Sequence, residues 1–115
     1  MTPYKRGLVV LINYPNSDLI SFKKRPALVV QANTLRTGLG QTIVAMITSN
    51  LERTGPTRIR IASASITGQA MGLMCDSVIV VDNIATVLDR EIDKSIGTLR
   101  DMSTIDTALR LIFDL

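Results

Sequence analysis

The sequence predicts an α+β domain: a small, strongly bent antiparallel sheet or barrel followed by one C-terminal helix. Short apolar segments recur along most of the 115-residue chain and are separated by turn-forming residues, a pattern typical of small sheets. The last segment instead shows apolar residues three and four positions apart, which indicates an amphipathic helix. The length allows one domain, residues 1–115, with a single modest core.

Six or so short strands are expected from these apolar segments. The first opens at Gly7, and the fourth alternates polar and apolar residues, which indicates a half-exposed strand. Asp76 interrupts a longer stretch, which is interpreted as a strand pair or as one bent strand. The expected strand segments are 8–12, 27–31, 42–48, 58–62, 73–81 and 84–88. The polar, glycine-bearing segment 63–72 is predicted to be a loop.

The C-terminal helix is predicted to begin at Ser103. Ser103 and Asp106 have the spacing of a capping box, with Asp in place of the usual Glu. One face carries the apolar side chains that we expect to pack on the sheet: Ile105, Ala108, Leu109, Ile112 and Phe113.

Composition excludes several kinds of site. The chain has no histidine and one cysteine, Cys75, so an internal disulfide, a His/Cys metal site and a serine–histidine or cysteine–histidine dyad are excluded. No metal or cofactor is therefore predicted, and acid–base chemistry falls to carboxylates, hydroxyls or a constrained arginine or lysine. A lone cysteine fits a reducing compartment, and no bilayer-spanning or signal-peptide pattern is found, so a cytoplasmic protein is expected.

Charge is distributed unevenly along the chain. Residues 1–60 hold nine basic and two acidic residues, a net charge of +7, whereas residues 61–115 hold four basic and eight acidic residues, a net charge of −4. A basic half predicts a polyanionic partner, either nucleic acid or an acidic protein segment, unless the two halves interleave in space. Aromatic residues are scarce, which argues against a large stacking platform for single strands.

The strongest candidate site is the run Lys23-Lys24-Arg25-Pro26 at the start of the second expected strand. Pro26 fixes its own φ and keeps Arg25 out of helical conformation. Arg25 is therefore expected to be the last residue of a loop, held rigidly at the entrance of a buried strand, which suits a phosphate site. The alternative is a gatekeeper cluster of charges that protects an aggregation-prone strand.

Two further positions carry polar groups beside apolar strands. Thr48 and Ser49 end the third expected strand, where hydroxyls either cap a turn or donate to a phosphate oxygen. Asp76 lies among apolar neighbours and either caps a turn or pairs with Arg25 or a backbone amide.

Four motifs occur in a characteristic order along nearly the whole chain. In chain order they are Arg6-Gly7-Leu8-Val9-Val10-Leu11, Arg25-Pro26-Ala27-Leu28-Val29-Val30, Met46-Ile47-Thr48-Ser49, and Asp76-Ser77-Val78-Ile79-Val80 followed by Ile84-Ala85-Thr86-Val87-Leu88-Asp89. Together with the terminal helix, this ordered set resembles the MazF/PemK-like toxins of type II toxin–antitoxin systems.

The resemblance implies an SH3-like (CcdB/PemK-like) antiparallel β-barrel with a C-terminal helix, usually found as a homodimer. It also implies a growth-inhibiting toxin that acts as an mRNA interferase: a metal-independent endoribonuclease that cuts single-stranded RNA at short sequences and leaves a 2′,3′-cyclic phosphate. The family's catalytic arginine and threonine fall on Arg25 and Thr48. An acidic cognate antitoxin is expected to cover the RNA site.

Around that pair, Ser49 and Asp76 are expected to support catalysis. Four polar residues of the first loop and its end are expected to bind RNA: Asn16, Ser17, Lys23 and Lys24. The general base is left open between Asp76, Asp18 and a mechanism carried mainly by strain and electrostatics. The chain departs from the family pattern at Leu8 and Met74. A CcdB-like gyrase poison and a catalytically inactive RNA-binding relative are the alternatives.

Overall fold

The computed structural model describes residues 4–15, 22–35 and 37–115. In these residues six strands form one antiparallel sheet, ordered β4-β5-β3-β2-β1-β6. The strands are β1 (Leu8–Pro15), β2 (Phe22–Val29), β3 (Gln41–Thr48), β4 (Arg58–Ile61), β5 (Ser77–Leu88) and β6 (Ile92–Thr98). Two α-helices, α1 (Ile66–Met71) and α2 (Ser103–Phe113), and the 3₁₀ turn η1 (Asp89–Glu91) complete the fold. The predicted α+β class is confirmed.

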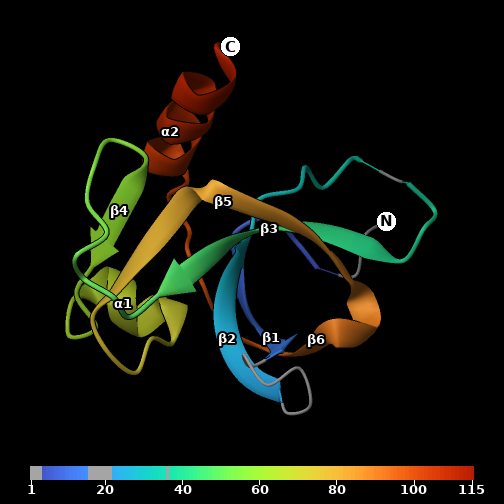
Figure 1. Cartoon of the computed structure of the whole chain (residues 1–115), viewed down its shortest axis with the longest axis horizontal. Coiled ribbons are helices and arrows are strands. Elements are labelled where there is room, and N and C mark those ends of the chain that lie inside the picture. Colours follow the sequence, from blue (N-terminus) through green and yellow to red (C-terminus); the bar gives the residue numbers. More distant parts are fainter. Residues whose placement is uncertain (1–3, 16–21, 36) are drawn as a thin grey trace.

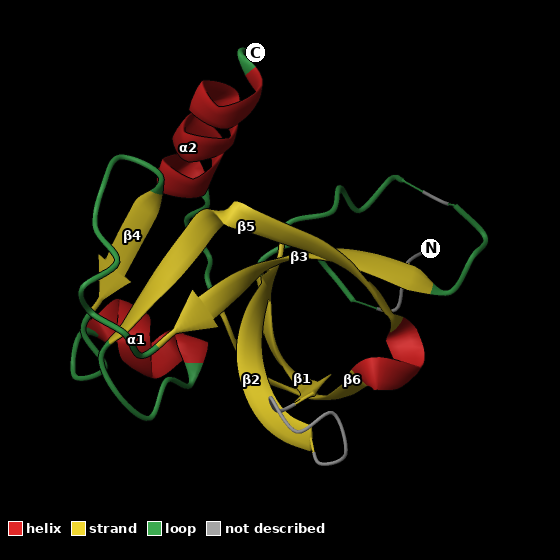
Figure 2. Ribbon diagram, in the orientation of Figure 1, coloured by secondary structure: helices red, strands yellow, loops and turns green. Residues whose placement is uncertain are grey.

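The sheet curls strongly but does not close (Figures 1 and 2). Among the described strands, β4 and β6 are the two edges and do not pair with each other. Helix α2 packs against β5 and β4, and α1 packs against β6. No helix in the described ranges is long and apolar enough to cross a bilayer.

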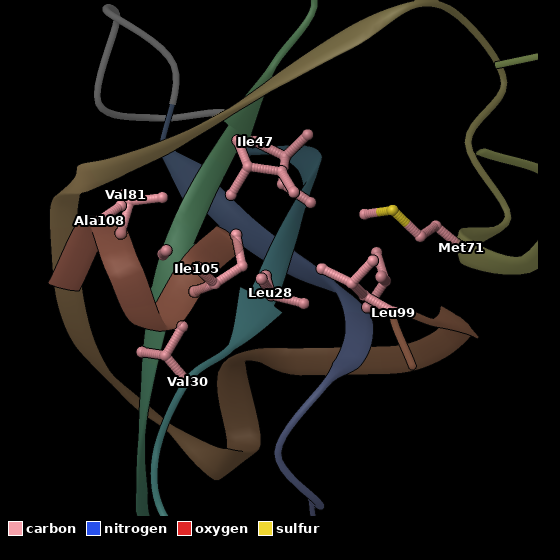
Figure 3. Close-up of a cluster of buried hydrophobic side chains, with 11 residues drawn as sticks. Leu28, Val30, Ile47, Met71, Val81, Leu99, Ile105 and Ala108 are labelled. Carbon is pink, nitrogen blue, oxygen red and sulfur yellow. The ribbon is translucent and has the colours of Figure 1, made fainter. Parts of the chain in front are cut away.

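Both faces of the central strands are buried, which explains their nearly unbroken apolar runs. Because side chains alternate along a strand, Leu28 enters one cluster while Ala27 and Val29 enter the other. The first cluster includes Ile105 and Ala108 of α2 and Met71 of α1 (Figure 3). The second holds Val10, Ile12, Val44, Met46 and Ile92.

The prediction of a loop over 63–72 is wrong, because the segment contains α1. Ser65 caps the helix: its hydroxyl accepts the N–H of Gly68 at 2.9 Å. Gly72 ends the helix in the left-handed conformation, at φ 74°. Both capping residues are visible in the sequence, but six residues are too few to establish a helical period.

The expected strands in the second half are also corrected. Residues 84–88 are not a separate strand but the end of β5, which begins only at Ser77 and does not include 73–75. Strand β6 was not predicted, because Asp93, Lys94 and Ser95 are exposed in succession and hide any alternation.

Helix α2 is confirmed from Ser103, but its capping box is not. Met102 is the N-cap residue and makes no side-chain cap. Asp101 instead accepts the N–H of Ser103 at 3.0 Å, while Asp106 accepts a bond of 2.6 Å from Arg6. The arginine and the helix are a hundred residues apart in sequence, so this ion pair ties α2 to the chain that enters β1.

Candidate active site

The site arises where strands β2 and β3 separate. They pair only from Ala27–Met46 to Val29–Val44, and beyond that Val30 donates to the Ile43 carbonyl at 3.1 Å. Backbone amides alternate in direction along a strand, so residue 26, four positions before Val30, also directs its nitrogen toward β3. That residue is Pro26, which has no N–H to donate. The ladder therefore ends at Ala27.

Arg25 and Thr48 lie immediately beyond this last rung. Each is two residues past the Ala27–Met46 pair, so the register places them opposite one another on the same face. Both line a pocket of about 400 Å³ at this position. The expectation that Arg25 ends a loop is wrong, because it lies within β2 and pairs with Ile12 of β1. Strand pairing, rather than the proline alone, holds it in place.

The guanidinium of Arg25 is fixed by an aromatic ring. Its Cζ lies 5.3 Å from the centroid of the Tyr14 ring, a cation–π contact, and Tyr14 also lines the pocket. Its Nε is buried and has no hydrogen-bond partner within the described part of the chain. An unsatisfied buried donor is costly, so this group favours an incoming anionic acceptor.

Thr48 performs the capping role expected of a strand-end hydroxyl. Its Oγ1 accepts the N–H of Asn50 at 3.1 Å. A hydroxyl that accepts in this way keeps its own hydrogen for donation toward the pocket. Ser49 follows Thr48 in the chain but is not among the residues that line the pocket.

The far wall of the pocket is built by an irregularity in β5. Between Ala45 and Met46 of β3, the partner on β5 jumps from Ile84 to Val80, so the intervening residues bulge from the ladder. Two of them, Asp82 and Asn83, line the pocket. A bulge of this kind redirects side chains, which places the carboxylate across from Arg25.

Asp82 is held by β4. Arg58 donates to its two carboxylate oxygens at 3.3 and 3.1 Å, and the Thr57 hydroxyl donates at 3.1 Å. The Arg58 guanidinium, more than any other contact, lowers the pKa of Asp82 below its ordinary value. Arg53 also lines the pocket, which makes its wall strongly basic.

Sequence reasoning missed five polar residues of this lining: Tyr14, Arg53, Arg58, Asp82 and Asn83. The alternation of Arg58 and Arg60 was a usable signal, because it predicts an exposed basic face on β4. Only Arg58 reaches the pocket, while the side chain of Arg60 is 63% exposed and lies 4.0 Å from Asp76. The bulge that brings in Asp82 has no signature in the sequence.

Asp76 lies outside the lining of the pocket. It accepts the backbone N–H of Ser63 at 2.9 Å and the Ser63 hydroxyl at 3.1 Å, which lowers its pKa. Of the partners that the sequence left open for Asp76, the structure therefore shows a backbone amide, that of Ser63 thirteen residues earlier in the chain, and not Arg25.

The remaining predicted residues fall in different places. Lys24 pairs with Asp93 of β6 at 3.1 Å. Lys23 is exposed and lies two residues before Arg25, so the alternation of β2 puts both on the same face. Asn16, Ser17 and Asp18 lie outside the described residues.

The same fold occurs in solved toxin structures. A mycobacterial endoribonuclease in complex with its cognate antitoxin matches with a TM-score of 0.72 at 22% identity, over 97% of this chain and 96% of that one. The Mycobacterium tuberculosis toxin MazF-mt6 also gives 0.72, at 24% identity over 94% and 97%. A MazE–MazF complex from Deinococcus radiodurans gives 0.71, at 15% identity over 97% and 96%. No curated protein sequence gives a significant match.

The sequence defines the family as well as the fold. Residues 5–113 match the profile of the PemK-like, MazF-like toxins of type II toxin–antitoxin systems. The chain belongs to this family, and the resemblance drawn from its ordered motifs is confirmed.

Proposed function

We propose that this toxin is a metal-independent endoribonuclease that cuts single-stranded mRNA at short sequences, with Arg25 and Thr48 binding the phosphate that is cleaved. One observation carries the proposal. A guanidinium whose buried Nε has no partner among the described residues stands opposite a strand-end hydroxyl, across a basic pocket. Planar guanidinium groups bind phosphate through paired hydrogen bonds, and a hydroxyl supplies a further donor.

The reaction that fits this pocket uses the RNA's own 2′-hydroxyl. The 2′-hydroxyl loses its proton to solvent water as its oxygen attacks the adjacent phosphorus and a 2′,3′-cyclic phosphate forms. The bond from phosphorus to the 5′-oxygen of the next nucleotide breaks, and that oxygen takes a proton from solvent water. Negative charge builds on the non-bridging oxygens, where Arg25 and Thr48 stabilise it. Asp82 is the carboxylate in the described lining, but its pair with Arg58 makes it a weak base. We therefore assign most of the rate to electrostatic stabilisation of the phosphate.

The basic pocket also suits the expected protein partner. The mycobacterial endoribonuclease was solved with its cognate antitoxin, and the Deinococcus radiodurans MazF with MazE. We propose that an acidic antitoxin segment covers Arg25, Arg53 and Arg58 and so excludes RNA, and that the working toxin is a homodimer.

The test is cleavage of a long single-stranded transcript in EDTA, with cut sites mapped by primer extension. Arg25→Ala is expected to lose about 100-fold or more in rate, as for other removed transition-state donors. Arg60→Ala is the matched control, because Arg60 lies on an exposed strand position outside the pocket. Thr48→Val is expected to lose activity that Thr48→Ser retains. A 2′-deoxy substitution at the cut site should block the reaction.

Other results would reject the proposal. RNA that stays intact across varied sequences but is bound with steep salt dependence would identify an inactive RNA-binding relative. Inhibition of DNA supercoiling without RNA cleavage would identify a CcdB-like gyrase poison. Equal rates for Arg25→Ala and Arg60→Ala would remove Arg25 from the mechanism.

A further inference from the structure

A second pocket of about 350 Å³ adjoins the phosphate pocket. The two share Tyr14 and Met46, so these side chains form a common wall. The second pocket lies between the end of β1, the end of β5 and the turn η1, and neither Arg25 nor Thr48 is among its lining residues. A ligand bound at Arg25 can therefore extend past Tyr14 into the second pocket and stay in contact with the protein.

The lining of this second pocket has the chemistry of a nucleobase site. Its interior is apolar, formed mainly by Ile12, Met46, Ala85 and Val87. Polar groups are few, and Glu91 is the acidic one among the described residues. A nucleobase presents two apolar faces and a polar edge, and proteins bind splayed bases by stacking on aromatic rings and by hydrogen bonds to that edge. The volume falls within the range of ~300–1,000 Å³ for small-molecule pockets.

We infer that this pocket binds the nucleobase next to the cleaved phosphate, and that Glu91 selects among bases at that position. The inference rests on the proposed function, since it requires a phosphate at Arg25. Arg25 covers the Tyr14 ring from the phosphate side, and the same ring lines the second pocket. Tyr14 is thus placed to order the guanidinium and to contact the base.

Glu91 predicts which bases are preferred. An ionised carboxylate accepts hydrogen bonds and donates none. Cytosine, adenine and guanine each offer an exocyclic amino group, whereas the one donor on the pairing edge of uracil, N3–H, lies between two carbonyl oxygens that repel a carboxylate. Among the described residues, the ion-pair partner of Glu91 is Arg90, whose Nε lies 4.0 Å from the carboxylate, beyond hydrogen-bond distance, so the carboxylate oxygens can accept such a bond. We therefore expect the three amino-bearing bases to bind better than uracil.

The experiment measures binding and does not depend on cleavage. Full-length toxin is titrated with inorganic phosphate and with the 3′-monophosphates of cytidine, adenosine, guanosine and uridine. NMR follows the Arg25 Nε–H and the methyl groups of Ile12 and Val87, which line the second pocket and not the first. Phosphate alone should shift the Arg25 signal. The nucleotides should also shift both methyl signals, with uridine monophosphate binding several-fold more weakly than the others.

Two pairs of variants sharpen the test. Ala85→Phe adds bulk on the strand face that lines the pocket, beside Val87, and should weaken nucleotide binding about ten-fold, the size of one lost stacking contact, while leaving phosphate binding intact. Ser95→Phe is the control, because it adds the same bulk at an exposed position of β6. Glu91→Gln should remove the discrimination against uracil, and Glu52→Gln, at an exposed position outside both pockets, should not.

The outcomes separate the inference from the proposed function. Nucleotide shifts confined to Arg25, with Ile12 and Val87 silent, overturn the base site and leave the phosphate site standing. Equal binding of all four nucleotides by wild type and by Glu91→Gln overturns the role of Glu91. A silent Arg25 signal with every ligand overturns the proposed function and the inference together.

Discussion

Replacing Pro26 with alanine tests why the pocket exists at all. Alanine restores an N–H directed toward β3, where the register places the Ile47 carbonyl opposite. We expect the new bond to extend the ladder by one rung. Arg25 and Thr48 would then approach the separation of paired residues, about 4.5–5.5 Å between Cα atoms, which leaves no room for a phosphate between their side chains.

The expected energies make the test specific for activity. One added hydrogen bond stabilises the fold by about 0.5–1.5 kcal/mol. Losing proline frees the unfolded chain and costs about 0.4–1 kcal/mol. These terms nearly cancel, so the free energy of unfolding should change little. A displacement of about 1 Å at a catalytic group can cost ~100-fold in rate, and we expect a loss of that size.

Three measurements follow the change in Pro26→Ala: amide hydrogen exchange at residue 26, urea unfolding, and RNA cleavage. Pro56→Ala, in the exposed loop before β4, is the matched control. Our reasoning fails if the new amide is protected and cleavage is unchanged, because separation of the strands would then be irrelevant. It also fails if cleavage is lost while the new amide exchanges freely, because the rung would not have formed.

The other predictions concern stability. Arg58 and Thr57 keep the pKa of Asp82 below the unfolded value near 4, so their contribution is present above that value and is lost as pH falls through the lower, folded pKa. Asp82→Asn should lower the free energy of unfolding at pH 7 by about 0.2–1 kcal/mol, as for exposed ion pairs. The melting temperature of the variant should also fall less steeply than that of the wild type below pH 4. An equally steep fall in both proteins would contradict this prediction. Gly97→Ala should destabilise by about 1–3 kcal/mol or more in urea unfolding, because its Cβ would lie 2.3 Å from the carbonyl carbon of Met71, and a cost equal to that of Ser95→Ala would refute the clash.

The sequence was sufficient for the central strands and for the residues at their ends. Continuous apolar runs predicted β1 to β3 because both faces of these strands are buried. Arg25 and Thr48 were both predicted as site residues and both line one pocket, although Arg25 was assigned to a loop. That error came from taking Pro26 as a strand boundary, whereas a proline is tolerated inside a strand where the neighbouring ladder ends.

The rest of the pocket depends on contacts that no local pattern records. Asp82 reaches it through the bulge of β5, and Arg58 through pairing of β4 with that same strand. Tyr14 reaches it because β1 continues past the predicted end at Ile12. Each position follows from register between distant segments, and register is set by the whole packed sheet and not by nearby residues.

The opposition of Arg25 and Thr48 has a consequence for insertions and deletions. Removing one residue between Arg25 and Val29 would turn the guanidinium to the opposite face of the sheet. The number of residues between Arg25 and the paired part of β2 is therefore constrained. The connection from 32 to 40 joins the two strands outside the ladder, and lengthening it costs only slowly growing closure entropy. We therefore expect homologous chains to vary in the number of residues between the arginine and the threonine. Insertions and deletions should be absent from the few strand positions next to each of the two residues.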